Sequence, residues 1–344
     1  MYYSPPPRPA TARSIGRFDD GARAVPTRGQ VLAGAMLANL AVLLLMLAAT
    51  RLRIDWRSPG AFTYYGVCLL ALAIRLGLAR SPHRVGVALA SFAEYATTFM
   101  LIGLLGAVGS YPVSAASHGF YDPALQRIDE ALHFDWLAWY ALVSTHPSLQ
   151  VAGRIAYEAI YLTPAVMLGY FAWTGRRREA QTMLATFWIA AAITLAMFWF
   201  MPAVGPFAYL WHGPIPYMPA SELWQPELIP AMRHHIVHII DPGALRGLVS
   251  APSFHTAAAV LYIAIAWPYR RLRWPVMGVN VAMLLSTPVE GTHYLADMLA
   301  GAAVALTSLG LIAWLERLPV RAALARRSTA AAVLDARLGT SRLT

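Results

Sequence analysis

The chain has 344 residues, of which 58% are hydrophobic and only 13% are charged, whereas an ordinary soluble domain carries about 25% charged residues. A soluble core cannot cover so much apolar surface, so the expected solvent is a lipid bilayer. The net charge of +10 does not indicate nucleic-acid binding, because the basic residues are arginines that lie mostly at the ends of apolar segments. The single cysteine, Cys68, excludes an intrachain disulfide framework.

The first 29 residues are rich in proline and arginine and show no apolar periodicity, which predicts a flexible cytoplasmic tail. No small-residue cleavage pattern follows the first apolar segment, so we expect a retained membrane helix and not a signal peptide. Eight segments approach the roughly 20 apolar residues that cross a bilayer. They are 31–50, 61–79, 85–111, 151–173, 180–201, 254–269, 274–289 and 294–315. The prediction is an all-α, polytopic membrane helical bundle of about eight transmembrane helices over 30–316, followed by a cytoplasmic tail at 317–344.

Arginines predict which face of the membrane each loop occupies. With eight helices, one face receives Arg8, Arg13, Arg17, Arg23, Arg28, Arg80, Arg84, Arg176, Arg177, Arg178, Arg270, Arg271, Arg273, Arg317, Arg321, Arg326 and Arg327. The positive-inside rule makes that face cytoplasmic, together with both termini. The loops 112–150, 202–253 and 290–293 then lie outside. One loop departs from the rule, since it places Arg51, Arg53 and Arg57 on the outer face.

The first outer loop has a helical pattern of its own. Apolar and acidic residues recur near helical spacing between Tyr121 and Trp136. This pattern predicts an amphipathic helix that lies along the membrane interface.

Two short segments place ionisable groups at the outer ends of membrane helices, where such groups are costly unless they are used. His293 and Asp297 are four residues apart and share one face of a helix, so the carboxylate can orient one ring nitrogen and leave the other as a nucleophile or base. Pro252, Ser253 and His255 begin another helix, whose free N–H groups suit a phosphate. Each feature also has a purely structural interpretation, as a helix-end ion pair, a helix N-cap or an interface histidine.

Together these segments resemble two motifs of the membrane-bound type 2 phosphatidic acid phosphatase superfamily, roughly P-S-x-H and S-R-x5-H-x3-D. The resemblance covers about residues 85–315 and implies a six-helix phosphatase-like core. It also implies that His293 is the nucleophile that forms a phosphohistidine and that Asp297 orients it. By the same resemblance, His255 is the general acid and Ser253 contacts the phosphate.

The chain departs from this family pattern in its positive charges. Thr287 stands where the third motif has arginine, and the first motif, K-x6-R-P, is not recognisable. The stretches from Tyr121 to Trp136 and from Met201 to Pro206 resemble the subgroup that includes fungal inositol phosphorylceramide synthase. Arg233 and Arg246, in the outer loop that leads to Ser253, are candidate phosphate-binding groups because a guanidinium can bind phosphate bidentately. Both can equally be solvent-facing loop charges.

One further residue and one cluster are also candidates for a functional site. Glu290, three residues before His293, can perturb this histidine or pair with an arginine. A second group, His234, His235, His238 and Asp241, has two histidines at the spacing that can share a zinc ion. No third ligand or second shell is identifiable, so no metal site and no cofactor are predicted.

The predicted function is hydrolysis of a lipid phosphate at the periplasmic or outer face, with the bilayer and a membrane lipid as partners and no nucleic acid. The absence of lysine and the abundance of Ala and Arg favour a bacterial inner membrane. Transfer of a phosphorylated headgroup, such as inositol phosphate, to a lipid hydroxyl is the first alternative. A transporter or non-catalytic lipid-binding protein is the second, because four ionisable residues fall within predicted helices: Arg75, Glu94, Arg154 and Glu158. The oligomeric state is not predicted.

Overall fold

The structure, a computed structural model, describes residues 28–78 and 80–340, so the predicted N-terminal tail lies outside the described residues except for Arg28 and Gly29. The long helices are α1 (Arg28–Ala49), α2 (Pro59–Gly77), α3 (Arg84–Ala116), α7 (Ala159–Thr174), α8 (Arg177–Phe200), α11 (Phe254–Ala266), α12 (Arg270–Glu290) and α13 (Leu295–Thr340). The short ones are α4 (Asp122–Ala131), α5 (Trp136–Ser144), α6 (Pro147–Tyr157), α9 (Pro206–Leu210), α10 (Gln225–Arg233) and the 3-10 helix η1 (Pro242–Ala244). The all-α membrane bundle is therefore confirmed.

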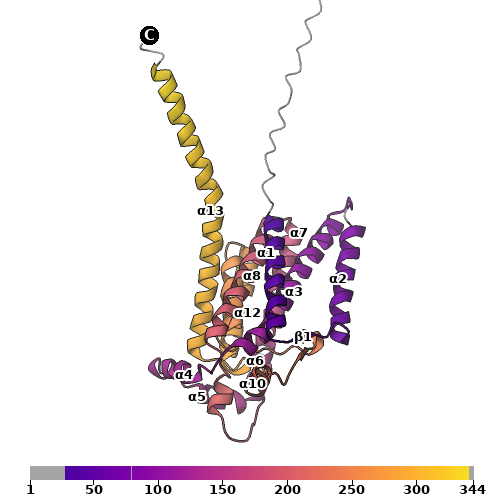
Figure 1. The fold of residues 1–344 in the computed structure, drawn as a ribbon, viewed down its shortest axis with the longest axis vertical. Coiled ribbons are helices and arrows are strands. Elements are labelled where there is room, and N and C mark those ends of the chain that lie inside the picture. The colour runs from indigo at the N-terminus through magenta and orange to yellow at the C-terminus, as the bar shows by residue number, and fades with distance from the viewer. Residues whose placement is uncertain (1–27, 79, 341–344) are drawn as a thin grey trace, which may run out of the picture.

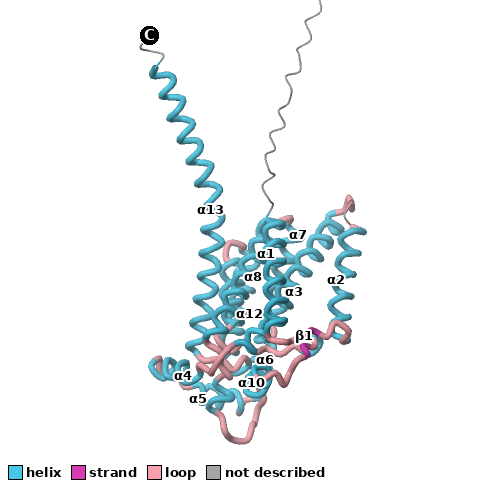
Figure 2. The backbone as a smooth tube through the Cα atoms, viewed as in Figure 1, coloured by secondary structure: helices cyan, strands magenta, loops and turns pink. Residues whose placement is uncertain are grey.

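The long helices run side by side, and most of the short elements gather at one end of the bundle, as Figures 1 and 2 show. The described chain begins with α1 at the opposite end, and α13 extends beyond the bundle at that same end. The two long loops predicted for the outer face thus lie together, away from the start of α1.

Each of the eight predicted segments is helical, but fewer of them are long and apolar enough to cross a membrane. Among the described residues, α1, α2, α3, α8 and the Leu295–Arg317 part of α13 meet that description. The segment predicted as one helix at 151–173 is instead two, α6 and α7, bent by 43°, and they make a sixth span if counted together. Of the other two, α11 has only 13 residues, and α12 begins with arginines.

Proline explains part of the irregularity in the α6–α7 segment. Pro164 lies inside α7 and has no N–H to donate to the carbonyl of Ile160. The Tyr262 hydroxyl from α11 donates to that carbonyl instead, at 3.3 Å. A side chain from another helix therefore compensates for the backbone bond that the proline removes.

The interfacial helix predicted between Tyr121 and Trp136 ends earlier than expected, as α4 at Ala131, and a separate helix, α5, begins at Trp136. The break comes at His133, whose φ of +57° ends the first helix. The second helix begins at Asp135, whose side chain accepts the N–H of Ala138 at 3.0 Å. A left-handed residue between two helical patterns was not recognisable from apolar spacing alone.

The loop that departs from the positive-inside rule is tied to the end of the bundle where the two long loops lie. Its strand β1 (Arg53–Ile54) pairs in parallel with β2 (Ile239–Ile240) from the second long loop. Gly60 also lies so close to Gly243 that a Cβ added there would come within 2.0 Å of the Gly243 Cα. This loop therefore lies at the same end of the bundle as the second long loop, despite its arginines.

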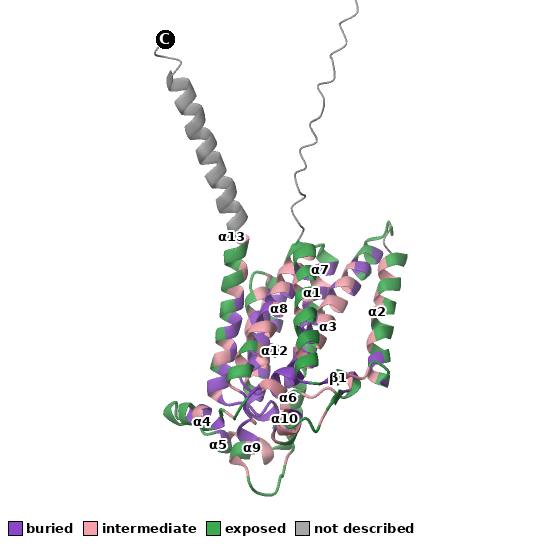
Figure 3. Ribbon diagram, viewed as in Figure 1, coloured by how far each residue is buried: buried purple, intermediate pink, exposed green. Residues whose placement is uncertain are grey.

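The main core lies between α3, α7, α8, α11 and α12. Its large buried side chains include Ile102, Phe171, Phe187, Tyr262 and Met283. Figure 3 shows buried residues concentrated in this centre and in the loops at its outer end, whereas α1 and α2 are largely exposed. The segments with His255 and His293 lie where this core meets the loops.

Candidate active site

His293 lies in the turn between α12 and α13, oriented by Asp297 in the first turn of α13. The His293 Nδ1 is 2.9 Å from the Asp297 Oδ1, and the two side chains are 4% and 0% exposed. The other oxygen of Asp297 accepts the backbone N–H of Tyr294 at 2.8 Å. One carboxylate thus contacts the imidazole on its Nδ1 side and also binds the turn that carries it.

A second buried carboxylate, Asp129, caps the same helix from α4. Its two oxygens accept the N–H groups of Leu295, at 2.9 Å, and Ala296, at 2.7 Å. These are donors that the first turn of a helix cannot satisfy internally. Burial raises the pKa of Asp129, while the two backbone bonds act in the opposite direction.

A third carboxylate, Asp122, joins the two stretches that resemble the synthase subgroup. It accepts the N–H groups of Val204 and Gly205, each at 3.0 Å, and the hydroxyl of Tyr294, also at 3.0 Å. Gly205 has a φ of +91°, and a Cβ there would come within 2.7 Å of the Thr292 carbonyl oxygen. Segments far apart in sequence therefore pack against the turn that contains His293.

The segment with Ser253 and His255 is joined to α13 through its backbone. The Ser253 N–H donates to the carbonyl of Asp297 at 3.1 Å. A Cβ on Gly301 would lie 2.2 Å from the Ser253 carbonyl oxygen, so only glycine allows this approach. The Ser253 side chain is the N-cap of α11, accepting the N–H of Thr256 at 3.4 Å.

His255 and His293 line the same cavity, of about 260 Å³. Apolar residues of α3 and α8, including Ile102, Gly103 and Phe187, form much of its wall, and Ser221 and Gln225 also line it. The His255 ring is stacked on Tyr157, with centroids 3.8 Å apart and planes 15° apart. The structure therefore brings together both predicted histidines and Asp297.

Sequence reasoning missed Tyr157. This residue ends α6 within an apolar stretch, where no motif or charge distinguishes it from a core aromatic. Asp122 and Asp129 were noted only as part of a family-like stretch, without a role in holding α13.

The two predicted phosphate-binding arginines lie elsewhere. Arg233 donates to the Ser117 hydroxyl and the Gly119 carbonyl, both at 2.9 Å. The guanidinium of Arg246 lies 3.8 Å from the ring centroid of Trp224. Neither residue lines the cavity that contains the histidines.

Glu290, for which sequence reasoning left several roles open, holds an outer loop against the site. Its carboxylate accepts the Tyr217 hydroxyl at 2.7 Å and the Ala220 N–H at 3.0 Å. Burial and this carboxylate raise the pKa of Tyr217 to about 12. Glu290 therefore binds loop residues and not an arginine.

The residues considered as candidates for metal binding or transport make other contacts in the structure. Across residues 28–78 and 80–340, no three His, Cys, Asp or Glu side chains are grouped to hold a metal ion, and Asp241 instead accepts the N–H of Gly243 at 2.8 Å. Glu94 pairs with Arg75 at 3.3 Å and Arg177 at 2.7 Å. Arg154 donates to the carbonyl of Met218 in the second long loop at 3.0 Å.

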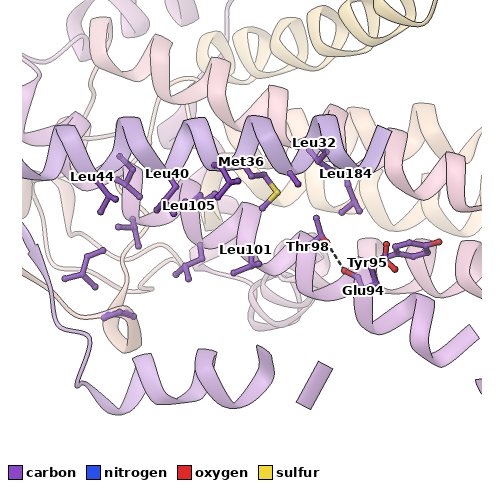
Figure 4. Close-up of a pocket in the computed structure, with 18 of the residues that line it drawn as sticks. Leu32, Met36, Leu40, Leu44, Glu94, Tyr95, Thr98, Leu101, Leu105 and Leu184 are labelled. Atoms are coloured by element: carbon purple, nitrogen blue, oxygen red, sulfur yellow. Dashed lines mark hydrogen bonds between the residues drawn. The ribbon is translucent and has the colours of Figure 1, made fainter. Parts of the chain in front are cut away.

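A larger cavity, of about 550 Å³, contains none of the predicted site residues. Figure 4 shows leucines of α1 facing Leu101 and Leu105 of α3, with Glu94 and Thr98 near one end. Its walls consist mainly of apolar side chains, with few polar groups. It lies apart from the histidines, so its size does not make it the reaction site.

The comparison with protein families agrees with the motifs and the geometry. Residues 123–311, which include both motifs, match the model of the PAP2 superfamily. The chain belongs to the PAP2 superfamily. Searches of curated proteins and of solved structures give no match. Because members of this superfamily are phosphatases and phosphotransferases, membership supports a multi-pass membrane enzyme of the phosphatase type that acts on a lipid phosphate.

Proposed function

We propose that this enzyme cleaves a lipid phosphate ester at the outer face of a bacterial inner membrane through a phosphohistidine on His293. The observation that carries the proposal is that His255 and the Asp297-oriented His293 line one cavity. A phosphoester cleavage needs a nucleophile and a proton donor for the leaving oxygen, and the two imidazoles can divide these tasks.

In the first step, the His293 Nε2 attacks phosphorus while the bond to the leaving oxygen breaks. Protonated His255 gives its proton to that oxygen and becomes neutral. The positive charge that develops on the His293 ring is stabilised by Asp297, at 2.9 Å from Nδ1. In the second step, water attacks phosphorus, the P–N bond breaks, and His255 takes the proton from the water.

Phosphate binding is proposed at the start of α11. The N–H groups of Phe254 and His255 are in the first turn, where no acceptor is available within the helix. Together with the positive end of the helix dipole, they favour a phosphoryl oxygen beside Ser253. In this proposal Ser253 contacts the phosphate while its side chain caps the helix.

The central test is His293→Ala, with His83→Ala as the control. His83 is exposed at the start of α3, and its side chain makes no capping bond. His293→Ala is expected to lower turnover of a lipid phosphate at least about 10³-fold, with the protein still recovered from membranes, whereas His83→Ala keeps its activity. A phosphorus–nitrogen adduct trapped on wild type and missing in His293→Ala would support the intermediate. Full activity in His293→Ala rules it out.

Headgroup transfer to a lipid alcohol is the second candidate, and the charge of the cavity favours it. The lining residues include two histidines and no arginine. A phosphodiester carries one negative charge, so it needs less positive charge than the dianion of a monoester. With a lipid labelled at phosphorus, hydrolysis of a monoester yields free labelled phosphate, whereas transfer moves the label into a second lipid.

A further inference from the structure

The two histidines of the site are oriented in different ways. His293 has a carboxylate at 2.9 Å. Among the described residues, no side chain or backbone group makes a hydrogen bond with the ring of His255, and its close ring contact is with Tyr157. The His255 ring therefore depends on packing for its orientation, and both of its nitrogens are left for the substrate.

Tyr157 is well placed to supply that packing. Its ring is parallel to the imidazole within 15°, at a centroid distance of 3.8 Å, and only 9% of the residue is exposed. On another side it approaches the turn that carries His293, because a Cβ on Gly291 would lie 3.0 Å from the Tyr157 Cε2. One ring thus contacts both halves of the site.

The position of Tyr157 is set by its helix. Four residues earlier in α6, a Cβ on Gly153 would lie 3.2 Å from the Glu290 Oε1 at the end of α12. Arg154 then fastens α6 to the second long loop through the Met218 carbonyl, at 3.0 Å. The last residue of α6 is therefore held against the catalytic turn.

We propose that Tyr157 is a positioning residue that holds the His255 imidazole, by stacking, in the orientation that protonates the leaving oxygen. This inference rests on the acid role of His255 in the proposed function. A neutral aromatic face suits an acid, because a carboxylate partner would occupy one ring nitrogen and hold the proton more strongly.

The experiment compares two phosphate monoesters that transfer the same phosphoryl group but differ in the leaving group, a long-chain alkyl phosphate and p-nitrophenyl phosphate. An alkyl alcohol leaves as a strongly basic oxygen and needs a proton, whereas p-nitrophenol leaves without one. Release of the leaving group is followed in a single turnover, because His255 also acts as the base in the second step, which both esters share. Tyr157→Leu is expected to slow this release about tenfold or more for the alkyl ester, within the range of general acid catalysis. For the p-nitrophenyl ester the release is expected to stay within about threefold of wild type, because that leaving group needs no proton.

Matched variants separate stacking from other roles. Tyr157→Phe keeps the ring and is expected to retain most of kcat on both esters, and His255→Ala should reproduce the leaving-group dependence of Tyr157→Leu. Tyr170→Leu is the control for the loss of a tyrosine ring in this region, since the Tyr170 ring makes edge and tilted contacts with Phe171 and Tyr269 and is not stacked on His255. If Tyr157→Leu does not fold, Tyr157→Met takes its place in the same comparison.

An equal loss on both esters, or no loss on either, overturns the proposal for Tyr157. Loss in Tyr157→Phe as large as in Tyr157→Leu also overturns it, because the ring would then not be the part that matters. Failure of the proposed function has a different signature: His293→Ala would remain active on both esters. The two inferences can therefore fail separately.

Discussion

The two histidine-bearing segments of the site are held by different forces. Buried carboxylates fix the turn with His293, since Asp297, Asp129 and Asp122 all bind backbone or side-chain donors at the start of α13 or next to it. Close packing fixes the segment with His255, through Gly301 on one side and Tyr157 on the other. In the proposed mechanism, the nucleophile that becomes positively charged thus lies beside a carboxylate, and the acid that releases a proton lies beside a neutral ring.

Breaking the carboxylate contact to the nucleophile should have the largest effect. Asp297→Asn keeps the shape and an oxygen for the Tyr294 N–H, but it removes the charge that stabilises the His293 ring. We expect kcat to fall about 10³- to 10⁴-fold, measured on protein purified in detergent, with little change in its melting temperature. Activity within tenfold of wild type would contradict the role of Asp297 in orienting His293.

The packing side can be tested with a pair of glycines on α13. Gly301→Ala places a Cβ 2.2 Å from the Ser253 carbonyl oxygen, whereas a Cβ on Gly310 meets nothing within 4 Å. Because backbone must shift, Gly301→Ala is expected to destabilise the protein by about 1–3 kcal/mol and to displace the phosphate-binding turn. Gly310→Ala is the control and should melt at or above the wild-type temperature. Equal melting temperatures and activities for the two variants would show that the close approach is unimportant.

Weakening the cap of α13 should destabilise the protein to a similar extent. Asp129→Asn retains one acceptor for the two N–H groups of Leu295 and Ala296, so one buried donor loses its partner. The expected cost is about 1–3 kcal/mol of stability, read as a lower melting temperature and reduced kcat. Glu130→Gln, at the exposed neighbouring position, is the control. If both variants behave alike, Asp129 does not hold the helix that carries the site.

The smallest effect is expected from replacing Arg246, one of the two arginines predicted to bind phosphate. Arg246 stacks on Trp224 and does not line the cavity, so Arg246→Met should change KM less than about threefold, in the range of an exposed cation–aromatic contact. Steady-state kinetics on vesicles or mixed micelles would measure it. A tenfold rise in KM would instead indicate that Arg246 binds phosphate. The segment with His255 would then be held by a charged contact as well as by packing.

Much of the local structure could be predicted because it depends on near neighbours. Apolar segment length identified the membrane helices, and the four-residue spacing of His293 and Asp297 placed both on one helix face. The N-cap position of Ser253 followed from Pro252 and the apolar run after it. The bend at Glu158 and the break at His133 were missed, because a single backbone angle leaves little trace in an apolar pattern.

The sequence by itself determined the expected lipid surroundings of this protein, its helical class and the two segments proposed to carry the chemistry, because hydrophobic length and helical spacing act over a few residues. Only the tertiary structure decided that His255 and His293 share a cavity, that Asp122 and Asp129 hold α13, and that Arg233 and Arg246 bind elsewhere. The hydrogen bonds of Asp122, Asp129 and Arg233 join positions more than a hundred residues apart. They depend on how the whole bundle packs, and no local spacing encodes them.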